Sequence, residues 1–337
     1  MEEAPYRNPL RTAAIRPAEL LPWLAAGAGF FLFPDYLQLG SQILIMVLFA
    51  MSLDLILGYA GIVSLGHAAL FGTGAYTAGI LSAHVGWSEP ISGLLIAGLV
   101  AGVVGFVCGA VILYTRGLTL LMLTLAVTIL LQELANEQEH WTGGDDGLQG
   151  VVMEPLLGTF EFDLYGQTAY LYALAVLFVV FLAARAIVNS SFGQSLRGIR
   201  ENERRMHAVG APVYRQMLRI YTIAAVMAGI AGALLAQTTE FVALDVLSFE
   251  RSGDVMIMLI LGGTGRLYGA FIGAPVYMIL QDQLAKLSPE YWLFGIGSLL
   301  VATILYAPEG MLGLAERCRA WLVREDTPSV RPERSES

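Results

Sequence analysis

The stretch at residues 58–81, GYAGIVSLGHAALFGTGAYTAGIL, contains the residue pair that comes nearest to a catalytic arrangement. Ser64 and His67 are three residues apart, so on a helix they would share a face, as a nucleophile and its base do in a hydrolase. No acidic residue stands in this stretch to orient the histidine, and the chain has no G-x-S-G, G-x-G-D or H-E-x-x-H motif. The pattern therefore favours a neutral histidine held inside a helix bundle, facing a transport pathway, over an intramembrane hydrolase.

Three carboxylates within apolar stretches offer a second kind of chemistry. Asp54, Asp254 and Asp282 would suit a proton- or sodium-coupled carrier, which needs titratable groups inside the membrane. Asp254 and Asp282 are near the expected outer ends of their segments, where water makes ionisation easy, whereas Asp54 is deep in its segment. An ion-coupled secondary transporter that depends on Asp54 remains an alternative interpretation.

The composition is that of an integral membrane protein. Of 337 residues, 56% are hydrophobic and only 14% are charged, and the mean hydropathy is +0.65. The formal net charge of -9 leaves no basic surface for nucleic acid. The chain has no GxxxxGK[ST] motif, so ATP binding by a P-loop is excluded.

Apolar segments of membrane-spanning length recur along the chain and predict an all-α fold with about ten transmembrane segments. The expected spans are residues 20–37, 41–57, 62–83, 91–113, 117–134, 168–188, 217–237, 253–265, 267–285 and 291–306. We expect a cytoplasmic N-terminal segment at 1–19, a permease domain at 20–306 and a cytoplasmic tail at 307–337.

The charges between the segments predict the orientation in a bacterial plasma (inner) membrane. Residues 185–219 hold seven arginines, which places this loop in the cytoplasm by the positive-inside rule. Residues 135–167 hold seven acidic residues and no Lys or Arg, which places that loop outside. The TGGDDG sequence at 142–147 has the composition of ordinary turns, and its spacing does not support a metal site. A docking surface for an extracytoplasmic partner is its functional alternative.

Glycine clusters interrupt the third and eighth segments. Because segments 2–5 and 7–10 would form an inverted repeat, these two segments would occupy matching positions, which is typical of a transport pathway. Close helix packing is the competing explanation, and it is favoured for GLVAG and GFVCG at 98–109. The residues expected to line or gate the pathway are Ser64, Gly66, His67, Gly72, Gly74, Tyr76, Gly262, Gly263 and Gly265.

The cytoplasmic loop at 189–216 predicts a short amphipathic helix. Ser190 or Ser191 can cap it, and Phe192, Leu196 and Ile199 follow at helical spacing. A helix too polar to insert must dock on the lipid surface, on its own bundle or on a partner subunit, and the residues alone leave the three options open.

Five sequence blocks resemble the permease subunits of ABC importers for branched-chain amino acids, a family that includes urea, amide and aromatic-acid systems. The resemblance extends from the second segment to about residue 314, through GYAGIVSLGHAALFGTGAYTAG, TGGDDGLQG, FGQSLRGIRENERRMHAVG, LGGTGRLYGAFIGA and LYAPEGMLGL. It implies alternating access driven by ATP hydrolysis in separate subunits, with no enzyme activity and no cofactor in this chain. The implied solutes are branched-chain or other hydrophobic amino acids.

The resemblance also implies partners and a coupling element. The expected partners are a second homologous permease, two cytoplasmic ATP-binding subunits, an extracytoplasmic solute-binding protein and the lipid bilayer. The amphipathic helix would enter a groove on the ATP-binding subunit, with Phe192, Leu196 and Ile199 filling it. The chain departs from the family at Arg205 and Met206, where small residues are common. The expected coupling residues are Phe192, Gly193, Leu196, Arg197, Ile199, Arg200, Glu201, Glu203 and Gly210.

Overall fold

The computed structural model of the chain is built from helices. It describes residues 21–156, 158, 160, 166–287, 290–306 and 310–313. The predicted N-terminal segment 1–19 and nearly all of the predicted tail 307–337 lie outside the described residues, so the division into domains stays a prediction. The described chain contains isolated β-bridges but no β-strand. The all-α prediction is therefore confirmed.

A helix occupies each of the ten predicted segments. These helices are α1 (Leu21–Leu32), α2 (Leu37–Asp54), α3 (His67–Ala83), α4 (Pro90–Ile112), α5 (Leu118–Glu137), α7 (Gln167–Asn189), α10 (Val213–Thr239), α11 (Phe249–Gly262), α12 (Ala270–Leu287) and α13 (Trp292–Tyr306). Within the described chain, five helical stretches are long and apolar enough to cross a membrane: Pro34–Tyr59, Pro90–Ile112, Leu118–Glu137, Gln167–Asn189 and Val213–Thr239. A count of ten crossings remains a prediction.

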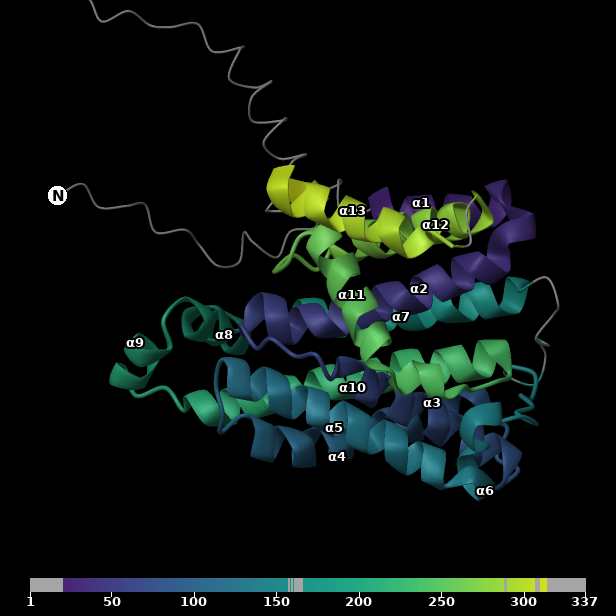
Figure 1. The fold of residues 1–337 in the computed structure, drawn as a ribbon, viewed down its shortest axis with the longest axis horizontal. Helices are drawn as coiled ribbons and strands as arrows, with labels where there is room; N and C mark the ends of the chain where they lie inside the picture. The colour runs from purple at the N-terminus through teal and green to yellow at the C-terminus, as the bar shows by residue number, and fades with distance from the viewer. Residues whose placement is uncertain are drawn as a thin grey trace, which may run out of the picture.

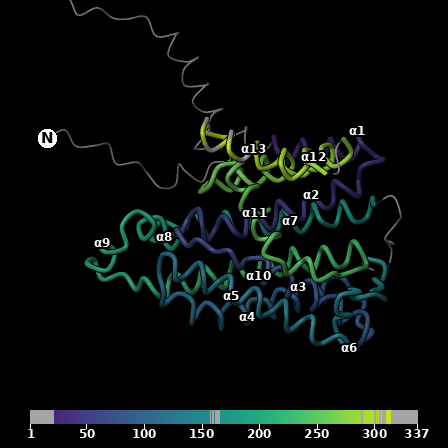
Figure 2. Tube along the Cα trace, in the orientation of Figure 1, coloured from purple at the N-terminus to yellow at the C-terminus, as the bar shows by residue number. Residues whose placement is uncertain are grey.

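The long helices run side by side along the long axis of the molecule (Figure 1). Helix α10 packs against α2, α3 and α4, while α2 also packs against α7 and α12. Helix α11 runs obliquely to these long helices in both Figure 1 and Figure 2, and it contacts α2, α3 and α12. The short helices α8 (Ser191–Glu201) and α9 (Glu203–Ala208) lie at one end, and α6 (Glu139–Thr142) lies at the other. The arginine-rich and acidic loops are thus at opposite ends.

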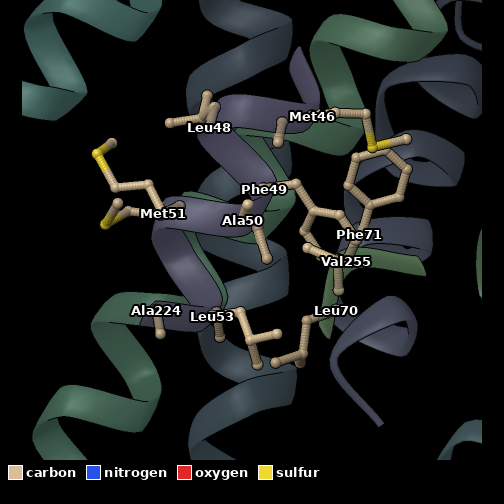
Figure 3. Packing of buried hydrophobic residues seen from close by; sticks show 14 of the residues in the cluster. Met46, Leu48, Phe49, Ala50, Met51, Leu53, Leu70, Phe71, Ala224 and Val255 are labelled. Atoms are coloured by element: carbon tan, nitrogen blue, oxygen red, sulfur yellow. The ribbon is translucent and has the colours of Figure 1, made fainter. Parts of the chain in front are cut away.

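Helix α2 forms the centre of the bundle. Its side chains from Leu44 to Asp54 are all buried, and Figure 3 shows Phe49, Leu53 and their neighbours packed against residues from α3, α10 and α11. The α2 sequence is apolar on every side, as expected for a helix surrounded by protein. Helix α5 differs, because only 22% of its apolar window is buried, compared with 78% for the window that contains α2. One side of α5 is therefore left for lipid or another chain.

The glycines of α4 bring this helix close to α10. A Cβ atom at Gly98 or Gly102 would come within 3 Å of Ile230 or Val226, and one at Gly109 would come within 3 Å of Tyr221. The packing role predicted for the glycines at 98–109 is confirmed. Small residues at such a contact let two backbones approach, which favours dispersion contacts between membrane helices.

Candidate functional site

The first glycine-rich stretch is broken just before α3. After α2 the chain forms a single π-helical turn, η4 (Leu55–Tyr59), and residues 60–66 are not helical. Gly61 has φ +74°, a conformation that suits glycine. Helix α3 then begins at His67, so Gly72, Gly74 and Gly79 lie within a continuous helix. The interruption is therefore produced by the residues between α2 and α3.

Within α3, the remaining glycines serve helix packing. A Cβ atom at Gly74 would overlap the backbone of Gly229 in α10, and one at Gly72 would overlap Leu247. The expected roles of Gly72 and Gly74 in a pathway thus have a packing explanation in the structure. Among the predicted pathway residues of α3, Tyr76 lines a hollow next to α5, to which Leu247 also contributes.

His67 is fully buried and pairs with a serine of α2. Its Nε2 atom is 2.8 Å from Oγ of Ser52, and its ring stacks on Phe49 with ring centroids 5.5 Å apart. The Ser52 hydroxyl donates its proton to the carbonyl oxygen of Phe49 at 2.6 Å, so the hydrogen bond from histidine requires a proton on Nε2. This interaction confirms that His67 is hydrogen-bonded within the bundle.

The Ser64–His67 pair is not formed on a helix face. Ser64 precedes α3 in the non-helical stretch, where its hydroxyl accepts a hydrogen bond from the N–H of Gly66 at 3.2 Å. The Ser52–His67 pair that does form is fully buried, with 0% exposure of both residues. Since neither arrangement presents an activated nucleophile to a substrate, the geometry does not support a hydrolase.

The second glycine-rich stretch meets the first. Helix α11 ends at Gly262, and the following Gly263 and Gly265 have φ of +108° and +77°. The N–H of Gly265 donates to Oδ1 of Asp54 at 2.7 Å, and a Cβ atom on Gly265 would lie 3.1 Å from the carbonyl oxygen of Gly58. The backbone breaks of two segments far apart in sequence are therefore in direct contact at the end of α2.

Asp54 anchors this contact from a fully buried position. Its residue exposure is 0%, and its Oδ2 atom has no hydrogen-bond partner among the described residues. The other two predicted intramembrane acids have side-chain partners: Asp254 accepts from the Tyr277 hydroxyl, and Asp282 is 2.6 Å from Nζ of Lys286. Of these three carboxylates, Asp54 is therefore the one that is most fully removed from water.

The arginine-rich loop folds into α8 and α9, each with a capped N-terminus. The Ser190 hydroxyl accepts from the N–H of Gly193 at 3.3 Å, and the Asn202 side chain accepts from the N–H of Arg205 at 3.0 Å. These contacts confirm the predicted serine cap and the amphipathic helix. Met206, one of the departures from the family pattern, packs against Gly198 and so fixes α9 on α8.

The apolar face of α8 is covered by the protein itself. Leu196 and Ile199 are only 1% and 4% exposed, Gly193 is buried, and Phe192 packs on the same core. Leu196 and Ile199 are already buried against their own bundle and so do not fill a partner's groove in this arrangement, whereas the contact of the half-buried Phe192 with a partner stays a prediction. Of the three docking options left open by the sequence, the apolar face adopts the second.

Two arginines connect α8 to the first broken segment. Arg197 lies over the Tyr59 ring with its Cζ atom 5.2 Å from the ring centroid, and Arg200 donates to the carbonyl oxygen of Gly58. The aliphatic part of Arg200 also lies against Gly61. Helix α8 is therefore linked through Gly58 to the contact between the two glycine-rich stretches.

The opposite side of the α8–α9 hairpin, defined as residues 191–210, faces outward. Glu201, Arg204 and Arg205 are exposed, Gly210 is exposed as well, and Val209 is 77% exposed. Glu203 forms an ion pair with Arg116 in the turn between α4 and α5. Beside this pair is a hollow of about 330 Å³ lined by Gly61, Val63, Leu120 and Met217 among others. The hairpin is thus anchored at several points and presents charged groups outward.

Sequence reasoning missed several partners that make this site. Ser52, Tyr59 and Arg116 were not among the candidates, although Ser52 and Tyr59 flank Asp54 in the same segment. The ion pair between Asp245 and Arg251, 2.5 Å apart, was also missed. The sequence did contain a signal for this pair. Charged residues beside a membrane segment usually have a charged partner, and Glu250 and Arg251 stand directly before an apolar segment.

The fold and the site define a multi-pass, all-α membrane protein whose surface hairpin is connected to breaks in its helices. The chain belongs to the family described as the permease component of the branched-chain amino acid transport system, whose family model matches residues 36–304. The match covers most of the chain and confirms the resemblance found in the sequence blocks.

Two permeases of Escherichia coli K12 are related over most of the chain. The high-affinity branched-chain amino acid transport system permease protein LivM is 26% identical over 313 residues, covering 86% of this chain and 72% of LivM. The corresponding permease LivH is 24% identical over 289 residues, covering 80% of this chain and 91% of LivH. A probable LivM permease from Methanocaldococcus jannaschii is 26% identical over 67% of this chain and 70% of its own length. No solved structure matches the chain significantly.

Proposed function

We propose that the chain is the transmembrane permease subunit of an ATP-driven importer for branched-chain or other hydrophobic amino acids. Family membership supports transport, and related permeases are named for branched-chain amino acid systems. In this proposal the chain itself catalyses no reaction and needs no cofactor. ATP hydrolysis belongs to two cytoplasmic ATP-binding subunits, and a solute-binding protein delivers the amino acid from outside.

The complete transporter in this proposal has a second, homologous permease and lies in the bacterial inner membrane. The chain crosses the bilayer ten times with both termini in the cytoplasm, and its two halves form an inverted repeat. The opposite placement of the arginine-rich hairpin and the acidic loop supports this orientation. The contact between the two broken segments supports their matching positions in the repeat.

The hydrogen bond from Arg200 to Gly58 is the observation that carries the coupling mechanism. The exposed side of the α8–α9 hairpin, with Glu201, Arg204 and Val209, contacts the ATP-binding subunit. Closure of the ATP-binding subunits moves the hairpin, and Arg197 and Arg200 pass this movement to the end of α2. The glycine-rich breaks absorb the change in backbone angles, and the bundle alternates between outward- and inward-open states.

The energy source can be tested with the complex in proteoliposomes. With binding protein and radiolabelled leucine on one side and ATP on the other, uptake should require both ATP and the binding protein. Dissipating proton and sodium gradients with ionophores should leave uptake unchanged. Uptake that needs a gradient and proceeds without ATP would contradict the proposal.

An ion-coupled carrier is the second candidate because Asp54 is buried with one carboxylate oxygen unpaired in the described structure. This function would require the charge of Asp54, whereas the ATP-driven importer requires only a hydrogen-bond acceptor for Gly265. The ionophore experiment and the Asp54 variants described below separate the two candidates.

A further inference from the structure

A hollow lies between α3 and α5, next to the acidic loop. Its volume is about 290 Å³, and its lining includes the apolar side chains of Ile80, Leu131, Leu134 and Leu247. Gln138 and Trp141 lie at the end formed by the loop after α5. The hollow is thus mostly apolar with a few polar groups, which is the composition expected of a small-molecule site.

Tyr76 supplies an unsatisfied polar group to the hollow. The residue is 6% exposed, and its hydroxyl has no hydrogen-bond partner within the described chain. Asp245 is two residues before Leu247, whose side chain lines the same hollow as Tyr76. A buried hydroxyl without a partner is destabilising, so a ligand that bonds to it would gain affinity from the group.

The segment that carries Asp245 packs along α3, toward the N-terminal end of that helix. The 3₁₀-helix η6 (Leu244–Leu247) places Leu247 against Gly72, and Ser252 at the start of α11 accepts a hydrogen bond from the N–H of Ala68 at 3.0 Å. Gly72 and Ala68 lie in the first turns of α3, far from its end at Ala83. Asp245 and Arg251 are therefore beside the middle of the bundle, where ionised groups are rare unless they serve a function.

Asp245 and Arg251 form a preoriented pair of opposite charges. The Arg251 Nη2 atom is 2.5 Å from Oδ2 of Asp245, and the two side chains are 25% and 58% exposed. The N–H of Arg251 is held by the Ser248 hydroxyl at 3.1 Å. Two other acids lie nearby: Glu250 is exposed, and Asp254 accepts a hydrogen bond from Tyr277. The partly exposed pair retains access for a charged ligand.

We propose that the hollow and the Asp245–Arg251 pair together form a transient binding site for an apolar α-amino acid in its zwitterionic form. The apolar side chain lies against Leu131, Leu134 and Leu247. The ammonium group donates to the Asp245 carboxylate and to the Tyr76 hydroxyl oxygen, while the Arg251 guanidinium donates to the ligand carboxylate. This inference rests on the proposed function and adds to it a solute site within the permease.

The proposal can be tested in the assembled transporter with L-photo-leucine, a diazirine analogue of leucine that crosslinks on illumination. The complex is held before hydrolysis with loaded binding protein, illuminated and analysed by mass spectrometry. Crosslinks should appear in residues 73–80 or 131–138. Tyr76→Phe, Asp245→Asn and Arg251→Gln should each lower crosslinking and leucine uptake by about tenfold, the effect of one lost hydrogen bond to a charged group.

Asp282→Asn is the matched control, because it breaks a similar ion pair with Lys286 on α12 and should leave both signals unchanged. Tyr76→Phe removes a single oxygen and therefore tests the site even if the charge variants fold poorly. Normal crosslinking and uptake in Tyr76→Phe, or wild-type crosslinks confined to other helices, would overturn the site. If the wild-type complex does not take up leucine with ATP, the proposed function itself is wrong.

Discussion

Arg200 of α8 donates a hydrogen bond to the carbonyl oxygen of Gly58, at the end of the π-helical turn that follows α2. Gly58 lies against Gly265, whose N–H is bound by Asp54 at 2.7 Å. A surface helix is thus connected, through one side chain, to the place where two interrupted membrane segments meet. This connection gives a physical route by which movement of α8 changes the arrangement of the bundle.

The topology predicts that positions 145 and 202 face opposite sides of the membrane. Cysteines introduced at Asp145 and Asn202 should react with an impermeant maleimide from opposite sides, with Asp145 labelled from outside. Both residues are exposed, so accessibility should not limit the reaction. Labelling of both positions from one side would contradict the ten-crossing arrangement.

Leu196→Ala should destabilise the permease itself. Because Leu196 is 1% exposed within the chain, removing its side chain should lower the free energy of unfolding by about 2–5 kcal/mol. The measurement is thermal unfolding of the isolated subunit in detergent. Val209→Ala is the control, because Val209 is 77% exposed and its truncation should change stability by less than about 0.5 kcal/mol. An unchanged Leu196→Ala subunit that fails to bind ATP-binding subunits would restore the partner-groove hypothesis.

Asp54→Asn should retain most ATP-driven uptake. The asparagine oxygen can accept the hydrogen bond that Gly265 now donates to Asp54. Asp54→Leu keeps the bulk without an acceptor and leaves the Gly265 N–H unsatisfied, which should destabilise the contact by about 1–3 kcal/mol. Uptake of leucine by both variants in proteoliposomes is the measurement. Loss of uptake in a correctly folded Asp54→Asn protein would favour the ion-coupled carrier.

Ser64→Ala should leave uptake within about twofold of wild type, because its hydroxyl is bound to the local Gly66 N–H, which corresponds to a modest net hydrogen-bond energy. The same variant would abolish a reaction that used Ser64 as its nucleophile. Initial rates of leucine uptake distinguish the two cases, and complete loss in a stable protein would contradict the structural role assigned here.

Much of the fold follows from the sequence because hydrophobic length and arginine placement are strong local signals. The segment at 168–188 corresponds closely to α7 (Gln167–Asn189), and 91–113 corresponds to α4 (Pro90–Ile112). The start of α3 was predicted five residues early, at 62 instead of His67. The apolar pattern continues through Ile62 and Leu65, so hydropathy alone could not show that the backbone there is not helical.

The site was harder to predict because its contacts join residues distant in sequence. The amphipathic pattern located α8, but it could not show whether Leu196 and Ile199 face their own bundle or another chain, since an apolar helix face can be buried against either. His67 was correctly expected to be hydrogen-bonded, yet its partner Ser52 lies on another helix. Spacing along a helix identifies neighbours within one element, whereas pairs between elements depend on how the bundle packs.

The most direct test of coupling through the hairpin is the number of leucine molecules transported per ATP in an Arg200→Met complex. The substitution keeps the aliphatic contact with Gly61 but removes the donor to Gly58. We expect normal assembly and stimulated ATP hydrolysis with transport per ATP lowered by about tenfold, and a smaller loss in Arg200→Lys, which keeps a charged donor. Arg215→Met, which alters an exposed arginine of α10, is the control and should match wild type. An unchanged ratio in the assembled Arg200→Met complex would contradict the account.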